Sequence, residues 1–478
     1  MQVTDLPTLP GDLISGHAKF FQSSLLDFCQ ALASNPNPMI RLNVFSLPLV
    51  FVNSPDLVHE LLVDNGRSVE KSMALRTALY PLGGNGLFTS EASIWKPQRK
   101  LMAPLFQPTH MGDYVSTMYQ CALRVAESLQ DGQVINLAQE MTRITMNIAG
   151  QTLFGADTFD ASDEIGKAIS ICLEHISTRT SSMTNILQAL SLGFWREFKK
   201  IPEGLHQKVS AFLLEPPLLP TAENKRFQEA LDFLNQTAKQ MIDDRRREGL
   251  TRKDLLTRLL GAQDENNVRM SDKQVRDETM TLFVAGHETT ANALSWCWHE
   301  LLNNPEIYKK LQAEADLFDE SQLSTEALSA LPYALQIFKE SLRMYPPVPA
   351  FDRQPQEDIK LGGVTIPKMM VCFVSPYSMH HNESLYPNPS SFDPARFTPE
   401  EEAKRHKYAF LPFGGGPRTC IGNFFAMMEG QIALAVLARR FTFERVPSHK
   451  VEMTQVGLLK PRDGVMVKVK ARPKIFLA

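Results

Sequence analysis

The sequence predicts a mainly α-helical chain with minor β structure, an α+β class in which residues 1–478 form one domain. Apolar residues recur three and four positions apart over most of residues 112–260, which is the period of an amphipathic helix. A longer helical pattern begins at Ser271. Stretches rich in β-branched and aromatic residues are short and lie near residues 40–55, 360–375 and 450–472. No linker rich in Gly and Ser divides the chain.

The first predicted element is a strand over residues 43–52 (NVFSLPLVFV), after which Asn53-Ser54-Pro55 favours a helix start. Helices follow, including one over Phe227 to Arg247. Prolines in the segments 201–204 (IPEG) and 215–220 (EPPLLP) forbid a continuous helix, and we expect a loop near a cavity there.

The longest helix begins at Ser271, whose side chain can cap it while Gln274 completes a capping box, and Asn304-Pro305 ends it. At 1.5 Å per residue this helix is about 48 Å long. Few of its central residues are charged (TLFVAGHETTANALSWCW), so we expect it to run through the core.

The C-terminal third mixes both structure types. A helix is predicted from Leu331 to Met344, because Tyr345-Pro346-Pro347 ends it, and another from about Ile421. The tail from Gly464 to Lys470 (GVMVKVK) alternates like a strand.

Composition narrows the function. The net charge of -3, from 50 basic and 53 acidic residues, gives no indication of a nucleic-acid partner. Six cysteines without CxxC spacing favour neither a zinc ribbon nor a disulfide framework, so we expect a reducing cytoplasm. The first twenty residues lack a basic head followed by an apolar core, and we expect no signal peptide or membrane anchor.

The segment 413–422 (FGGGPRTCIG) places Cys420 where a loop turns into a helix. Helix N-terminal amides stabilise a thiolate, and side-chain-free glycines let a flat macrocycle lie close to the backbone. A phosphate-binding loop needs Lys-Ser or Lys-Thr after the glycines, but Pro417-Arg418 stands there. A zinc site needs further ligands at short spacing, but the nearest other cysteine in the sequence is Cys372. A lone cysteine is usually a small buried apolar residue, but this context favours a single sulfur ligand to haem iron.

In the long helix, Ala285, Glu288 and Thr289 share one face by their spacing, with Gly286 beside them. A small residue makes room for a ligand, and an acid and an alcohol can supply protons. A zinc-protease HExxH motif starting at His287 fails, because position 291 is alanine. The alternative is a buried helix that uses small residues for close packing.

Two further pairs lie one helical turn apart. Glu340 and Arg343 can form a partly buried ion pair among apolar neighbours, although such pairs are usually solvated. Trp95 and Arg99 would ordinarily be a rim tryptophan and a solvated arginine, unless an anionic cofactor lies between them.

Together these segments resemble the cytochrome P450 family of haem-thiolate monooxygenases over most of the chain. Residues 413–422 match its Phe-x-x-Gly-x-Arg-x-Cys-x-Gly signature at every fixed position, and residues 285–290 and 340–343 are similar to its oxygen-binding and ExxR motifs. Residues 392–397 (FDPARF) resemble the segment whose arginine, here Arg396, joins the ExxR ion pair. The sequence departs from common family patterns at His380-His381 and Met369-Met370.

The resemblance implies the cytochrome P450 fold, with haem b between the long central helix and the helix that follows the cysteine loop. It also implies the site residues. Cys420 is the axial iron ligand, Phe413 shields its sulfur, and Glu288 and Thr289, with Ala285 and Gly286, serve dioxygen activation; the remaining cofactor contacts are Trp95, Arg99, Arg353, Gly414, Arg418 and Gly422.

The reaction implied is hydroxylation or epoxidation of an apolar molecule such as a fatty acid, terpenoid or steroid. Only 58 residues follow Cys420, counting from 420 to 478, so we expect electrons from a separate ferredoxin or flavodoxin and its NAD(P)H-dependent reductase. Basic residues beside the motifs could dock that partner or be an ordinary solvated face: Lys96, Lys100, Lys404, Arg405 and Lys407. Alternatives are a haem-thiolate peroxygenase or isomerase, and a non-catalytic haem sensor or carrier.

Four segments are predicted to wall the substrate pocket, and they are mostly apolar. They are the segment after Lys71, the region from Ser181 to Leu219, Val348 to Phe351, and Val456 to Leu459.

Overall fold

The computed structural model describes residues 1–473 except 13–14, 20–24, 46, 181, 197–208, 210–213, 215–220, 253 and 263–268. The proline-rich loop predicted at 201–204 and 215–220 lies outside the described residues. Within the described ones, helices dominate and strands are short, so the predicted mainly α class with minor β structure is confirmed.

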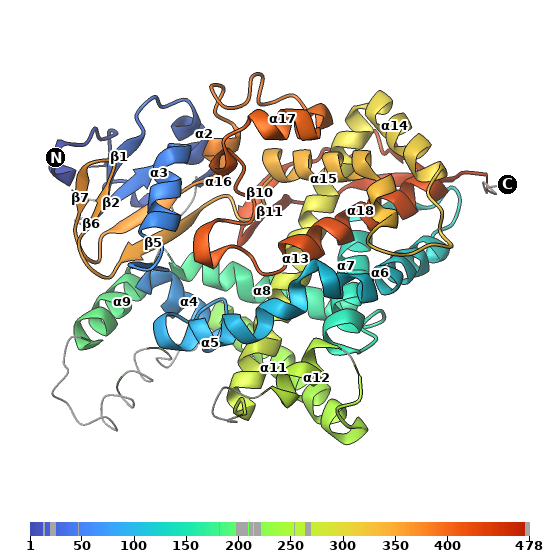
Figure 1. The fold of residues 1–478 in the computed structure, drawn as a ribbon, viewed down its shortest axis with the longest axis horizontal. Coiled ribbons are helices and arrows are strands. Elements are labelled where there is room, and N and C mark those ends of the chain that lie inside the picture. Colours follow the sequence, from blue (N-terminus) through green and yellow to red (C-terminus); the bar gives the residue numbers. More distant parts are fainter. Residues whose placement is uncertain are drawn as a thin grey trace.

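The helices fill most of the molecule (Figure 1). They are α2 (Leu25–Ala33), α3 (Pro55–His59), α4 (Met73–Gly83), α5 (Ala92–Met102), α6 (Pro108–Ser128), α7 (Leu137–Phe154), α8 (Ser162–Thr180), α9 (Met183–Arg196), α11 (Ala222–Glu248), α12 (Leu255–Gly261), α13 (Asp272–Asn303), α14 (Pro305–Asp316), α15 (Pro332–Met344), α16 (Pro376–His380), α17 (Pro399–Lys404) and α18 (Asn423–Arg440).

The strands form small sheets. They are β1 (Met39–Val44), β2 (Leu47–Val52), β3 (Val69–Glu70), β4 (Val134–Asn136), β5 (Phe351–Pro355), β6 (Ile359–Leu361), β7 (Val364–Ile366), β8 (Val371–Val374), β9 (Phe441–Arg445), β10 (Met453–Val456), β11 (Leu458–Pro461) and β12 (Met466–Ala471). The largest sheet has the order β1-β2-β8-β5-β3, and it lies on the side of the molecule that holds the N-terminus (Figure 1).

The central helix is α13. Ser271 caps it, because its Oγ accepts the backbone N–H of Gln274 at 3.2 Å, and the helix ends before Pro305 as predicted. It packs against α7, α15 and α18. Trp298 and Phe283 are fully buried on it, so the prediction that this helix runs through the core is confirmed.

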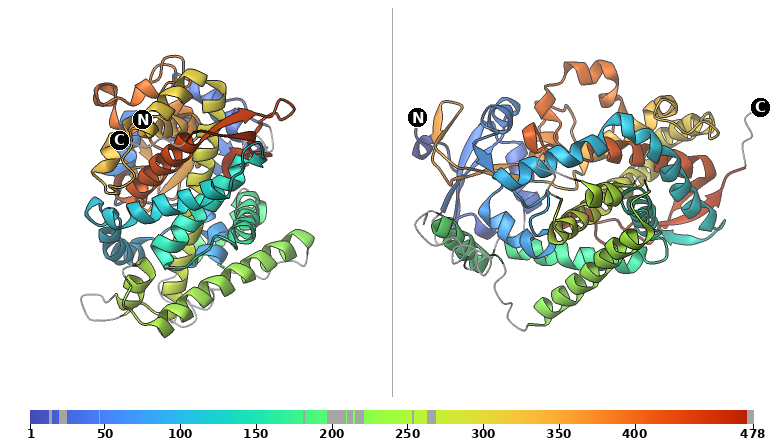
Figure 2. Two further views of the ribbon diagram at one scale, coloured as in Figure 1. Left: turned by 90° about the vertical axis from the view of Figure 1, so that its right-hand side faces the viewer. Right: turned by 60° about the horizontal axis from the view of Figure 1, so that its bottom comes forward.

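The main apolar core joins α6, α7, α13, α15 and α18, and a second, smaller core lies beneath the large sheet. Helix α11 lies at the outer edge of the molecule in both views of Figure 2. No helix among the residues described is both long and apolar enough to cross a membrane.

One element differs from its prediction. Residues 43–52 are not a single strand, because β1 and β2 form an antiparallel hairpin in which Val44 pairs with Leu47. Phe45 adopts a φ of 53°, a left-handed conformation that reverses the chain. Periodicity could not reveal this turn, since no Gly, Asn or Asp marks it.

Candidate active site

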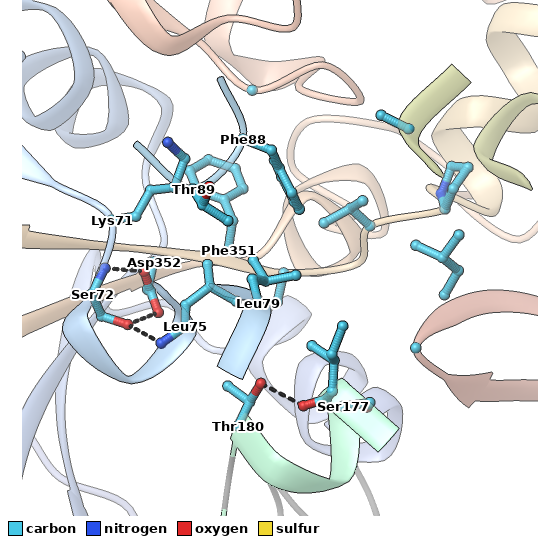
Figure 3. A pocket seen from close by; sticks show the side chains of 18 of the residues that line it. Lys71, Ser72, Leu75, Leu79, Phe88, Thr89, Ser177, Thr180, Phe351 and Asp352 are labelled. Carbon is cyan, nitrogen blue, oxygen red and sulfur yellow. Dashed lines mark hydrogen bonds between the residues drawn. The ribbon is translucent and has the colours of Figure 1, made fainter. Parts of the chain in front are cut away.

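A cavity of about 1610 Å³ lies between α13 and the loop that precedes α18. All four predicted walls contribute to it: residues 72–75, several residues of α9, Val348 to Phe351 without Pro349, and Val456 to Leu458. Figure 3 shows part of this space, with Leu79, Phe88 and Phe351 among the side chains that line it. The lining is predominantly apolar, so the cavity suits an apolar guest.

Cys420 opens onto this cavity from inside the molecule, whereas the other five cysteines are buried. Burial raises the pKa of the Cys420 thiol, while the Gly422 N–H and the nearby Arg99 guanidinium oppose that rise. Burial raises the pKa of Cys372 to about 12, which makes it an inert thiol. Among the six, Cys420 is therefore the sulfur that a ligand in the cavity can reach.

The loop before Cys420 is fixed by its backbone. Cys420 N–H donates to Phe413 O at 2.9 Å. Gly416 has a φ of +66°, and a Cβ there would lie 1.9 Å from Leu62 O, so no other residue fits. Helix α18 begins at Asn423, two residues beyond the predicted start at Ile421.

Arginine and tryptophan side chains border the same space. The Arg418 guanidinium lies 3.6 Å from the centre of the Trp95 ring, donates to Ser90 O at 3.3 Å and forms an ion pair with Glu91. Lys71 Nζ lies 3.1 Å from the other Glu91 oxygen. Burial lowers the pKa of Arg418 to about 10. Glu91 thus neutralises part of a buried cationic cluster.

A second charged group enters from β5. Asp352 accepts the Ser72 N–H at 2.8 Å and the Ser72 Oγ–H at 2.6 Å, as Figure 3 shows. Burial raises the pKa of Asp352 and lowers the pKa of the adjacent Arg353 to about 10. Arg353 lines the cavity.

The predicted motif of α13 is divided between two sides of the helix. Ala285, Gly286 and Thr289 line the cavity, and Thr289 Oγ1 donates to Ala285 O at 3.1 Å. Glu288 is buried and is not among the described cavity-lining residues. Its Oε1 accepts from Ser170 Oγ at 3.2 Å and lies 3.4 Å from Lys460 Nζ.

Glu340 and Arg343 meet in the interior, and both side chains are 0% exposed. Arg343 Nε donates to Glu340 Oε2 at 2.7 Å and its Nη2 donates to Oε1 at 2.8 Å. Arg396 Nε lies 3.5 Å from Glu340 Oε1. The structure therefore brings the three predicted side chains together and buries the first two completely.

Several charged residues of the site have no sequence motif. Lys71, Glu91 and Asp352 line or support the cationic side of the cavity, and Glu278 on α13 binds the loop before α5. The sequence marks Glu278 only as a charged residue in a helical segment, and many surface residues have the same pattern.

The predicted basic patch is smaller than its sequence suggests. Lys404 Nζ lies 2.6 Å from Glu401 Oε1, and Arg405 donates to Arg396 O while covering the Tyr386 ring. Lys96, Lys100 and Lys407 are exposed.

Comparisons with known proteins agree with this geometry. The family model described as Cytochrome P450 matches residues 7–469. The cyclooctatin synthase of Streptomyces melanosporofaciens is 33% identical over 92% of this chain and 91% of its own length. The pentalenene oxygenase of Streptomyces avermitilis is 29% identical, with 97% of each chain covered. The crystal structure of the cytochrome P450DA heme domain superimposes with a TM-score of 0.80 at 25% identity, over 98% of both chains.

The family model matches nearly the whole chain, including the helices and the cysteine loop described above. The chain belongs to the cytochrome P450 family of haem-thiolate monooxygenases.

Proposed function

We propose that the chain holds haem through Cys420 and hydroxylates or epoxidises a neutral, apolar molecule of the cyclic terpenoid class. The observation that carries the proposal is an apolar cavity onto which a single cysteine of the six opens. Bound haem supplies dioxygen activation, in which two electrons and two protons reduce one oxygen atom to water while the other enters the substrate.

The residues present fit haem. Its macrocycle is flat and apolar, and the open space beside Gly414 and Gly422, where an added Cβ would meet no atom within 4 Å, leaves room for it. Its two propionates need cations. Arg99, Arg353 and Arg418 all line the cavity, and they are the candidates for holding these carboxylates.

The role of Thr289 is to hold a proton at Oγ1 in the cavity, since its hydroxyl is the part of the acid-alcohol pair that reaches the space. Glu288, the next residue on the helix, pairs with Lys460, whose side chain is partly exposed to solvent. This arrangement supports dioxygen chemistry over a peroxide-driven or isomerase reaction, which needs no proton supply.

The cavity favours a neutral substrate over a fatty acid. Among the described residues that line it, Lys71 and Arg418 are paired with Glu91 and Arg462 is paired with Glu452. Lys368 also lines the cavity and is exposed. Arg99, Arg353 and Arg418 are assigned to haem. In the interior of the cavity, away from Lys368, a fatty-acid carboxylate would therefore compete with an ion pair or with haem. A cyclic terpene hydrocarbon, the class indicated by the name of the pentalenene oxygenase, needs no cation.

Electrons come from a separate ferredoxin or flavodoxin, and we place its docking near the exposed Lys96 and Lys407. Reversing both charges is expected to slow reduction by an acidic ferredoxin, because opposite charges steer association. The control is Lys239→Glu, which reverses an exposed charge on α11. An unchanged rate in the double variant rejects this docking site.

The test of the whole proposal begins with the reduced, carbon-monoxide-bound difference spectrum of the purified protein. A thiolate-type spectrum is expected, and Cys420→Ala is expected to lose it while the buried-thiol control Cys172→Ala keeps it. A histidine-type spectrum in the parent contradicts the proposal.

The substrate class is tested with a panel of cyclic terpenes, steroids and fatty acids, read by the spin-state shift and then by turnover. Terpenes are expected to shift the spectrum and to be oxidised with reductase, redox protein and dioxygen, but not with peroxide alone. Turnover restricted to fatty acids contradicts the substrate class, and binding without turnover favours a sensor.

A further inference from the structure

The loop between α4 and α5 carries Phe88 into the cavity. Leu87, Phe88 and Thr89 all line it, but only Phe88 is largely exposed there, at 47%. Figure 3 draws it with Leu79 and Phe351 among the side chains that line the same cavity. The position of this loop therefore decides how much of the cavity a substrate can use.

Two consecutive carboxylates of α13 hold the loop by its backbone. Asn85 N–H donates to Asp277 Oδ2 at 2.9 Å, and Leu87 N–H donates to Glu278 Oε2 at 2.9 Å. The second bond is made directly before Phe88. Both acids are buried, so these are charge-assisted or strong neutral bonds that water does not weaken.

The contact is too close for side chains on the loop. A Cβ on Gly84 would lie 2.2 Å from Asp277 Oδ1, and one on Gly86 would lie 2.1 Å from Thr281 Oγ1. Gly84 also has a φ of +50°. The two glycines thus let the backbone press against α13 where the carboxylates receive it.

The far side of the loop is tied to itself and to α5. Thr89 Oγ1 donates to Gly84 O at 2.6 Å, and Gln98 Nε2 donates to Asn85 O at 2.8 Å. The loop is therefore cross-linked to itself and to α5, and its bonds to α13 hold the side that faces the helix.

Glu278 differs from Asp277 in having no ion-pair partner among the described residues. Asp277 is paired with Lys273 at 3.2 Å and with Arg276 at 2.9 Å. Glu278 is 0% exposed, its Oε2 accepts the Leu87 N–H, and its Oε1 has no hydrogen-bond partner in the part of the chain described. A buried carboxyl group without a cation is costly, and within the described part of the chain the bond to the loop is the only hydrogen bond that its side chain makes.

We propose that Glu278 is a positioning residue that fixes Phe88 over the cavity and so helps to select the substrate and the atom that is oxidised. The effect on substrate rests on the proposed function, whereas the bond between Glu278 and the loop does not.

Ionisation gives this role a signature that a purely structural residue lacks. Burial, aided by the Asp277 charge, raises the pKa of Glu278 to about 7, although the Leu87 N–H lowers it. A hydrated glutamate titrates near 4.3. Opening of the loop would admit water, which removes the burial that raises this pKa, and it would also remove the Leu87 N–H, which lowers it. Because burial is the larger of the two causes, the closed loop binds the proton more tightly, and raising the pH through 7 favours opening. The other charges at the loop are Lys273 and Arg276, beside Asp277, and Arg76 of α4, which donates to Thr89 O at 3.1 Å.

The experiment is hydrogen exchange, read by mass spectrometry, on peptides covering residues 83–90 of the haem-loaded full chain at pH 6 and pH 8. Rates are corrected for the pH dependence of chemical exchange. Linkage predicts on the order of tenfold more opening at pH 8 than at pH 6 in the parent. Glu278→Gln keeps an acceptor oxygen but cannot ionise, so its corrected exchange is expected to be the same at both values.

Equal corrected exchange at both pH values in the parent overturns the proposal, and this comparison needs no variant to fold. A Glu278→Gln variant that retains the parent's pH dependence overturns it too. Asp277→Asn is the matched control, because Glu278 still titrates in it and the pH dependence is expected to persist.

The consequence for ligands is measured separately. The dissociation constant of a bulky, non-ionisable apolar ligand, read by the spin-state shift, is expected to change between pH 6 and pH 8 in the parent and not in Glu278→Gln. If no terpene is oxidised but exchange behaves as expected, the proposed function fails and this inference stands. If terpenes are oxidised and exchange is flat, this inference fails alone.

Discussion

Replacing Arg343 by alanine is expected to destabilise the fold more than removal of any exposed ion pair. Arg343 donates two hydrogen bonds to Glu340, at 2.7 and 2.8 Å, one to His380 O at 2.9 Å and one to Ser391 O at 3.2 Å. The guanidinium thereby ties α15 to the segment that leads to the cysteine loop.

The magnitude follows from what remains after truncation. Glu340 keeps the Asp393 N–H at 2.9 Å and Arg396 Nε at 3.5 Å, but two carbonyl oxygens and part of a buried negative charge lose their partner. Breaking a buried pair by removing one member costs about 3–5 kcal/mol. Because Arg396 compensates part of the charge, we expect the lower half of that range.

The measurement is urea denaturation followed by far-UV circular dichroism, with the haem absorbance as a second signal. Arg247→Ala is the matched control, since Arg247 forms the same i,i+3 pair with Asp244 on α11 but is 77% exposed. An exposed pair is worth about 0–1 kcal/mol. A loss below about 1 kcal/mol for Arg343→Ala, or equal losses for the two variants, would refute the argument from burial.

Three further outcomes are expected. Thr289→Ala is expected to lower the product formed per NAD(P)H consumed several-fold, whereas Thr279→Ala, which removes a buried hydroxyl bonded to Val275 O at 2.7 Å, should not; equal coupling in both variants contradicts the role of Thr289. Burial lowers the pKa of His381 to about 4. The unfolded chain therefore binds more protons than the folded chain between about pH 6.5 and 4, and stability falls as the pH drops through that range. His381→Asn should flatten part of this pH dependence in urea titrations, and an unaltered slope would assign the dependence to other groups. Ser72→Ala removes the α4 cap bonded to Leu75 N–H at 3.2 Å and one Asp352 bond, with an expected cost of about 0.5–2 kcal/mol in the same assay; no loss would mean that water replaces the hydroxyl.

The long helix and the cysteine loop could be predicted because their signals are local. Ser271 and Pro305 mark the ends of α13 within the sequence itself, and the glycines before Cys420 are required by backbone geometry. Such constraints act over a few residues, so a pattern of a few residues contains them.

Charged residues that act across the fold could not be predicted in this way. Glu91 meets Arg418, and Glu278 meets Leu87, only after chain segments far apart in sequence have come together. Their chemistry depends on burial and on partners, and neither is written in the neighbouring residues. The hairpin turn at Phe45 is a local feature, but it was missed because Phe45 is not a residue type that usually marks a turn.

The acid and alcohol of α13 show where local reasoning ends. Consecutive residues of a helix are about 100° apart, so their spacing alone does not decide whether Glu288 and Thr289 both face the cavity. The structure resolves the choice: Thr289 lines the cavity with Ala285, and Glu288 faces Ser170 of α8 and Lys460 of β11. A carboxylate function in the cavity therefore requires Glu288 to leave Lys460, or to act through Thr289. Since β11 also carries Leu458 into the cavity, the ion pair links the substrate wall to the helix that holds the alcohol.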